Sequence, residues 1–166
     1  MIKLFDGKFR DHKVSFIMQA ALAGVAVSAA LILFDVVYQP VIIASFGASG
    51  FIAFTTPHRD ISRPRCLIGG YIIGILVGCA MYYFTLLPVK TYLLQMAVHI
   101  LAVGIAVALA TFLMTITDTE HAPAASVAVG VVINDWAFYT LVTIMVGIIV
   151  ISILKETLKR KMIDLL

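Results

Sequence analysis

Charged side chains are scarce in this sequence. Asp, Glu, Lys and Arg make up 13% of its 166 residues, whereas hydrophobic residues make up 62%. A water-soluble fold of this length would leave a large apolar surface uncovered, so this balance argues against a soluble domain. Basic patches interleaved with aromatic residues are also lacking, and we therefore expect no binding of nucleic acid. The composition indicates an integral membrane protein whose main partner is the lipid bilayer.

Cysteine is equally rare, with Cys66 and Cys79 as the two examples. They stand 13 residues apart and would lie at opposite depths of one helix, so a disulfide between them is geometrically implausible. Neither belongs to a spacing typical of metal ligands, and no nucleophile stands at a suitable spacing from a base. We therefore expect no metal, no cofactor, no catalytic residue and no enzymatic activity.

Long uncharged runs divide the chain. Four of them are about as long as a helix that crosses the hydrocarbon core: residues 14–34, 67–87, 93–116 and 137–154. Two shorter uncharged stretches, 41–56 and 122–134, lie between them, close to Pro40 and Pro123. As helices, the short stretches would reach only about 24 and about 20 Å, which is less than the hydrocarbon thickness. Their length alone permits either short crossing helices or re-entrant hairpins.

The distribution of Lys and Arg distinguishes these two possibilities. If both short stretches are re-entrant, the 12 basic residues divide nine against three across the membrane, because the loop with Arg59, Arg63 and Arg65 falls opposite the N-terminus. If both stretches cross, the division is eleven against one, with Lys90 alone outside. The excess of basic residues on the cytoplasmic side favours six crossings in the cell (inner) membrane, with both termini cytoplasmic.

The two halves of the chain carry related small-residue patterns. Gly47-Ala48-Ser49 and Ala124-Ala125-Ser126 hold matching places in the short stretches, and Gly70 and Gly147 match in the long runs that follow. Both pairs are offset by 77 residues. Coincidence among common small residues is the alternative explanation.

The predicted fold is an all-α polytopic membrane bundle forming a single membrane domain. It has four long transmembrane helices plus two short membrane-inserted helices, arranged as a 3+3 inverted repeat. The first half covers about residues 14–87 and the second about 92–158.

Several motifs resemble one known family. The run Ser45-Phe-Gly-Ala-Ser-Gly-Phe51 is followed by Thr56-Pro-His58 and by Ser62-Arg-Pro-Arg-Cys-Leu-Ile-Gly-Gly-Tyr71. Further along, His121-Ala-Pro-Ala-Ala-Ser126 is similar to a His-Pro-Pro motif that leads into small residues, with Ala122 in place of the first proline. In these motifs, and over nearly its whole length, the chain resembles the HPP family of integral membrane proteins.

The resemblance implies four membrane-spanning helices and a role in transport. Plant and cyanobacterial-type relatives in this family are linked to nitrite movement, and the resemblance is the source of the nitrite hypothesis. The departure at Ala122 argues against any role that requires two consecutive rigid φ angles at this motif.

The beginnings of the two short helices are suited to a small anion. A helix start exposes unpaired backbone N–H groups and about half a positive charge, here near Pro40 and His121. Ser45 and Ser49 share a helix face, and Ser126 holds the related place in the second half. We therefore predict a solute pathway lined by Ser45, Gly47, Ala48, Ser49, His121, Pro123, Ala125 and Ser126. Close helix packing in lipid requires the same small residues, so packing alone is the alternative.

His121 is the most informative titratable residue, and Asp118 and Glu120 stand beside it. A histidine at a helix entrance can donate to an anion and change its charge near neutral pH, so these three residues are candidates for proton coupling. The carboxylates would repel an anion unless one is protonated or paired with His121. The alternative is an interfacial loop with a satisfied histidine. His99, inside a long run, is expected to form a hydrogen bond between helices.

Polar residues between the second and third runs are candidates for a cytoplasmic mouth that attracts anions. They are His58, Arg59, Arg63 and Arg65. Arginines that flank membrane helices also fix topology and bind lipid phosphates, which is the alternative role. Asp60 is expected to pair with one of the arginines.

The leading hypothesis is a transporter or channel for a small solute, with a small inorganic anion such as nitrite as the first candidate. A non-conducting membrane scaffold or regulatory subunit is the main alternative, and an intramembrane enzyme is less favoured. A chain of 18.0 kDa is small for a lone transport unit, so we expect a homo-oligomer.

Overall fold

Helices make up the bundle in the computed structural model, which describes residues 11–34 and 40–166. The α-helices are α2 (Lys13–Phe34), α3 (Pro40–Thr55), α4 (Pro64–Thr85), α5 (Tyr92–Ile116), α6 (Ala122–Ile133) and α7 (Phe138–Leu158), and the 3-10 turns are η1 (Asp60–Ser62) and η2 (Lys159–Lys161). These described segments contain no strand. α2, α4, α5 and α7 are long and apolar enough to cross a membrane, whereas α3 and α6 are short apolar helices. The predicted all-α fold with four long and two short helices is confirmed.

Proline marks the beginning of three helices. Pro40 and Pro64 open α3 and α4, and Pro123 lies in the first turn of α6. Proline suits these positions because the missing N–H would have no intrahelical acceptor there. α4 consequently begins before the uncharged run and includes Arg65, and α7 likewise continues through Lys155. The charges therefore do not mark the helix ends.

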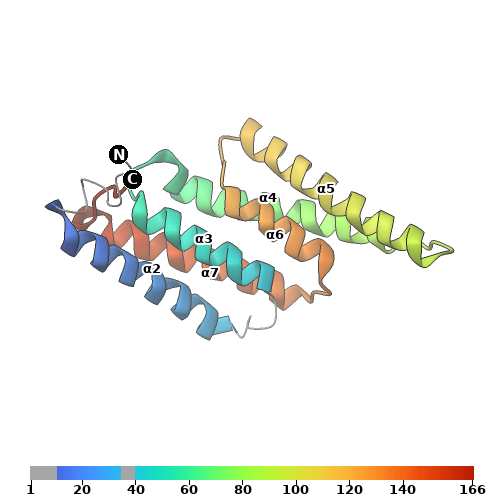
Figure 1. The fold of residues 1–166 in the computed structure, drawn as a ribbon, viewed down its shortest axis with the longest axis horizontal. Coiled ribbons are helices and arrows are strands. Elements are labelled where there is room, and N and C mark those ends of the chain that lie inside the picture. The colour runs from blue at the N-terminus through green and yellow to red at the C-terminus, as the bar shows by residue number, and fades with distance from the viewer. Residues whose placement is uncertain (1–10, 35–39) are drawn as a thin grey trace, which may run out of the picture.

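Successive helices alternate in direction (Figure 1). The side chain of Gln19, early in α2, donates to the carbonyl of Phe54 at the end of α3 and to that of Ile163 just after α7. Toward the opposite end, the Tyr82 hydroxyl in the last turn of α4 donates to Asp135, which follows α6. Each short helix therefore runs in the direction opposite to the long helices before and after it and does not fold back as a hairpin.

The two short helices lie against each other, and the four long helices surround them (Figure 1). α3 also packs against α2 and α7, while α6 packs against α5 and α4. The remaining main contacts join α4 to α5, α2 to α7, and α4 to α7. If α2 is exchanged with α5, α3 with α6 and α4 with α7, every main helix contact is replaced by another main contact or by itself. Corresponding helices of the two halves therefore have corresponding neighbours.

Glycines bring α4 unusually close to α6. Gly70, Gly74 and Gly78 lie one turn apart, and a Cβ atom added at Gly74 would stand 2.4 Å from the carbonyl oxygen of Ala124. In the second half, a Cβ at Gly147 of α7 would stand 2.7 Å from a ring carbon of Phe46 in α3. Both glycines that the sequence comparison paired thus face a short helix.

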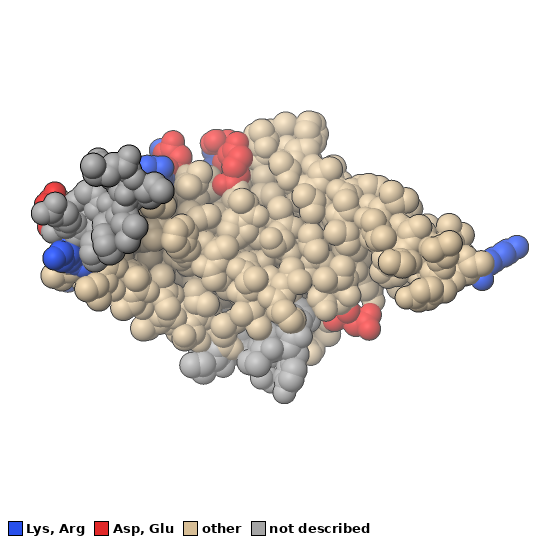
Figure 2. All heavy atoms as spheres, viewed as in Figure 1, with Lys and Arg blue, Asp and Glu red and all other residues tan. Residues whose placement is uncertain are grey.

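The described Lys and Arg side chains lie toward the two ends of the bundle, and most of the visible surface between them carries no charged side chain (Figure 2). The α4–α5 turn with Lys90 forms one end, and the other described Lys and Arg residues lie toward the end where α2 begins and α7 finishes. Lys3, Lys8 and Arg10, which enter the predicted charge division, lie outside the described residues. The described cations follow the distribution expected for two short crossing helices.

Candidate functional site

A buried chain of hydrogen bonds joins three helices at the centre of the bundle. The Ser49 Oγ atom of α3 lies 2.9 Å from the Tyr71 hydroxyl of α4 and 2.8 Å from Nε2 of His121, the N-terminal cap of α6. All three side chains are at most 2% exposed. The Tyr71 ring also lies against His121 and Phe46, with centroid distances of 5.9 and 5.8 Å. Two predicted pathway residues, Ser49 and His121, are thus in direct contact.

His121 directly precedes α6 and lies outside the four long helices. Burial lowers the pKa of His121 to about 4, although the backbone of Ile61 has a weaker opposing effect. Within the described residues no group stands in hydrogen-bonding geometry to Nδ1, and the Ile61 backbone acts on the ring as a nearby dipole. The imidazole is therefore neutral near pH 7. The proton-coupling hypothesis requires a histidine that changes its charge near neutral pH, and the lowered pKa of His121 argues against that role.

A recess of about 240 Å³ opens between α5 and the beginning of α6. It is lined by Thr111, Met114, Thr115, Glu120, His121, Ala122 and Ala125. Ala122, in the first turn of α6, lines this recess, and the N–H groups in the first turn of a helix lack intrahelical acceptors. Two predicted pathway residues, His121 and Ala125, meet here beside a helix start.

Other predicted pathway residues line separate grooves. Ala48 of α3 and Pro123 and Ser126 of α6 line an open groove of about 550 Å³ between the two short helices. Gly47 lines another groove between α3 and α2. Ser45 is buried, and its hydroxyl donates to the carbonyl of Val41 in the same helix. The predicted residues therefore surround α3 and the start of α6 without forming one continuous wall.

The sequence of these elements matches a known family. Residues 8–162 fit the family model described as HPP, transmembrane region. The chain belongs to the HPP family. All six helices and the Ser49–Tyr71–His121 hydrogen bonds fall within the match, and this HPP protein is an integral membrane protein. The resemblance predicted from the motifs is confirmed. Comparisons with curated proteins and with solved structures gave no match.

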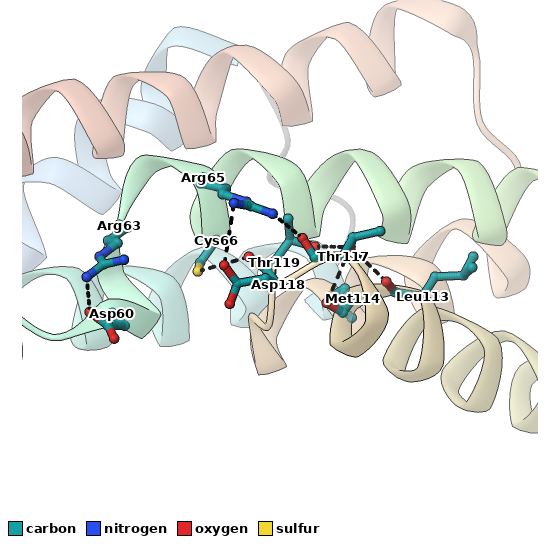
Figure 3. A network of polar contacts seen from close by, with 9 residues as sticks. All are labelled: Asp60, Arg63, Arg65, Cys66, Leu113, Met114, Thr117, Asp118 and Thr119. Carbon is teal, nitrogen blue, oxygen red and sulfur yellow. Dashed lines mark hydrogen bonds and ion pairs between the residues drawn. The ribbon is translucent and has the colours of Figure 1, made fainter.

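In this HPP protein Asp118 holds a helix-ending position. Asp118 directly follows Thr117, the C-cap of α5, and its φ of 54° places it in the left-handed region. The N–H of Asp118 donates to Thr115, and that of Thr119 donates to Met114, which together form a Schellman motif. The exposed Asp118 carboxylate also pairs with Arg65 at 3.4 Å (Figure 3).

Glu120 differs from Asp118 because it has no ion pair among the described residues. It is exposed and lines the recess beside His121. Neither carboxylate pairs with His121, whose polar contact is with Ser49. An anion in the recess would therefore meet one uncompensated carboxylate.

The predicted cytoplasmic-mouth residues are occupied by contacts within the protein, most of them with distant parts of the chain. The His58 N–H donates to Asp164, and its Nε2 lies 3.0 Å from the Met162 carbonyl oxygen. Arg59 donates to the carbonyl of Leu166. Arg63 forms an ion pair with Asp60, which confirms the predicted pairing (Figure 3), and Arg65 donates to Thr117 at 2.6 Å. These side chains connect the α3–α4 loop to the segment after α7 and to the α5–α6 turn.

Gln19 is a buried polar residue that the sequence reasoning missed. Its side-chain amide donates to the Ile163 carbonyl at 2.8 Å and accepts from the Ile163 N–H at 3.2 Å. The N–H of Leu165 donates to the Thr55 carbonyl nearby. A lone amide near the charged end of a long apolar run was the available signal. Gln19 fastens the segment after α7 across the ends of α2 and α3.

The expected interhelical hydrogen bond of His99 is wrong. His99 Nδ1 lies 2.9 Å from the carbonyl oxygen of Gln95, one turn earlier in the same helix. Gln95 itself makes the contact between helices, because its Nε2 donates to the Thr85 carbonyl of α4. The backbone carbonyl of Gln95 already supplies a hydrogen-bond partner for His99, so the ring does not need one from another helix.

Proposed function

We propose that this HPP protein is a transporter or channel for a small inorganic anion. The observation that carries the proposal is the recess where the start of α6 meets the buried His121. Unpaired first-turn N–H groups and the positive end of the helix dipole favour an anion at such a place. Nitrite is the first solute to test, because the motif resemblance extends to relatives linked to nitrite movement.

The neighbour relations of the helices support a 3+3 inverted repeat. The exchange of α2–α4 with α5–α7 preserves every main helix contact, and each helix runs opposite to its counterpart. Inverted repeats commonly place a solute site where the two halves meet near the middle of the membrane. In this protein α3 and α6 are in contact, and His121, which lines the recess, bonds to Ser49 of α3.

We further propose six crossings of the cell (inner) membrane with cytoplasmic termini. The alternating directions and the gathering of described cations at one end support this orientation. We also propose a homo-oligomer without enzymatic activity. Cross-linking in mild detergent that yields only an 18.0 kDa species would contradict the oligomer.

Uptake of nitrite into proteoliposomes tests the function. We expect flux above that of empty liposomes, and His121→Ala should lower it about tenfold because the start of α6 loses its buried hydrogen bond. His99→Ala is the matched control, since this histidine bonds only within α5, and should leave the flux within about twofold. Because the pKa of His121 is lowered to about 4, the rate should show no transition near pH 6.5.

Glu120 gives a second variant with the opposite expectation. Glu120→Gln removes the carboxylate from the recess and should raise anion flux, since repulsion of the solute is removed. A fall in flux would instead favour proton coupling through this residue. Wild-type flux no greater than that of empty liposomes would contradict transport and favour a scaffold or regulatory subunit. Equal flux in wild type and His121→Ala would exclude His121 from the pathway.

A further inference from the structure

The cations of the 3-10 turn η2 form no ion pair with the described part of the protein, although Lys159 interacts electrostatically with Glu156. Three other basic side chains have carboxylate partners: Arg63 with Asp60, Arg65 with Asp118, and Lys155 with Glu156. Lys159, Arg160 and Lys161 form no ion pair within residues 11–34 and 40–166, and the last two are exposed. Three adjacent positive charges are therefore available to an external anion.

The position of η2 matches the level of lipid headgroups. It continues directly from α7, whose long apolar stretch is interrupted first at Lys155 and Glu156. Cations immediately beyond a membrane helix lie beside the phosphate groups of the lipids. An external anion at this site is therefore most readily supplied by the bilayer itself.

The backbone of η2 is held in place on its far side. The Met162 N–H donates to the Lys159 carbonyl, and Met162 is only 3% exposed. Ile163 is bonded through both its N–H and its carbonyl to Gln19. The turn therefore presents its cations without further ordering of the chain, which reduces the entropic cost of binding.

An apolar surface adjoins the same cations. Ile153 of α7 is 57% exposed, and Thr157, one turn later, is also exposed. Arg160 and Lys161 follow at the next turn, so these residues share one side of α7 and η2. A free phosphate ion would use only the cations, whereas a phospholipid would also cover Ile153 with its acyl chains.

We propose that η2 and the adjoining surface of α7 bind an anionic phospholipid, with its phosphate group held by Lys159, Arg160 and Lys161. The Arg160 guanidinium suits a phosphate because its N–H groups match two oxygens, and the two lysines add compact charges. This site is formed by α7 and η2, whereas the solute recess is lined by α5 and α6. The proposal therefore stands independently of the transport function.

Native mass spectrometry of the detergent-purified protein tests this proposal, with phosphatidylglycerol and phosphatidylcholine as the added lipids. We expect preferential retention of phosphatidylglycerol, and a roughly tenfold or greater loss of it in the triple variant Lys159→Gln, Arg160→Gln, Lys161→Gln. Lys90→Gln is the matched control, because it removes a cation from the opposite end, and should bind like wild type. Arg160→Lys keeps the charge and should retain most of the binding.

Several outcomes would overturn the proposal. These are unchanged retention of phosphatidylglycerol in the triple variant, an equal loss in Lys90→Gln, and equal retention of phosphatidylcholine by wild type. Thermal stabilisation by inorganic phosphate equal to that by phosphatidylglycerol would assign the site to free phosphate. Gel filtration and circular dichroism of the triple variant keep a folding defect distinct from lost binding. Nitrite flux is not part of the readout, so failure of the transport proposal leaves this test intact.

Discussion

Ser49 has one hydroxyl group for two buried partners. It can donate its single proton to His121 or to Tyr71 and must accept from the other, so both contacts depend on one oxygen atom. Each partner is itself buried and has no water-exposed alternative. Loss of the Ser49 oxygen would leave both Tyr71 and His121 without this hydrogen-bond partner in the centre of the bundle. Loss of the Tyr71 hydroxyl would remove only one of the two hydrogen bonds and should therefore cost less.

We therefore predict that Ser49→Ala destabilises the protein by about 2 kcal/mol and Tyr71→Phe by only about 1 kcal/mol. The tyrosine variant leaves the Ser49–His121 hydrogen bond intact. Ser126→Ala is the matched control, because Ser126 makes no hydrogen bond with a described residue and should cost close to nothing. Thermal unfolding in one detergent would measure all three variants. Equal losses for Ser49→Ala and Ser126→Ala would contradict the assigned role of the hydroxyl.

Sequence reasoning reached part of this site. Ser49 and His121 could be named because small-residue motifs and a helix start have local signatures. Tyr71 could not be connected to them, although it follows a Gly-Gly pair, because its partner lies 22 residues away in another helix. Gln19 bonds to Ile163 across 144 residues and leaves still less local trace. Hydrogen-bond partners between helices depend on how the helices are rotated, and the sequence of this chain contains no direct record of that rotation.

Among the elements, α4 and α7 hold equivalent places but pack differently. When the two halves are aligned with the offset of 77 residues, Gly74 and Gly78 of α4 correspond in sequence to Ile151 and Lys155 of α7. α4 can therefore approach the backbone of α6, whereas α7 carries side chains at these two positions. The order of long and short helices could be predicted from the sequence, and so could their approximate ranges. The unequal closeness of the two contacts became apparent only when both partner helices were placed.

Gly74→Ala should destabilise the bundle by about 1–3 kcal/mol, because the added Cβ would meet the backbone carbonyl of Ala124 at 2.4 Å. The clash involves backbone on the far side, so a rotamer change cannot relieve it. Gly104→Ala in α5 is the matched control, since nothing lies within 4 Å of its added Cβ. It should be neutral or stabilise the helix by up to about 1 kcal/mol. Equal melting temperatures for the two variants would refute the close contact between α4 and α6.

For the whole molecule, both the alternating helix directions and the separation of the described cations are compatible with two crossing short helices. Lys90 occupies one end, and the α3–α4 loop and η2 lie toward the other. Length could not decide whether α3 and α6 run through, because both are shorter than the hydrocarbon core. The positive charges favoured two crossing short helices, and the alternating helix directions are compatible with that prediction. Arrangement in a membrane follows from that alternation only if both short helices reach the two surfaces.

Membrane-impermeant thiol labelling provides the corresponding test. In a background lacking Cys66 and Cys79, Arg63→Cys and Arg160→Cys should react from one side, and Lys90→Cys from the other. The Arg63 substitution is tolerable because an exposed ion pair with Asp60 contributes little to stability. Reaction of Arg63→Cys and Arg160→Cys from opposite sides would mean that α6 does not cross the membrane, because α4, α5, α6 and α7 separate these two positions.

The glycine surface of α4 has a consequence for biosynthesis. α4 leaves the ribosome before α6 has been made, yet its closest partner is α6 and not its own neighbour α3. Until the second half is inserted, the backbone along Gly70, Gly74 and Gly78 must be covered by lipid or by the insertion machinery. The final packing of α4 therefore depends on a helix that is synthesised after it.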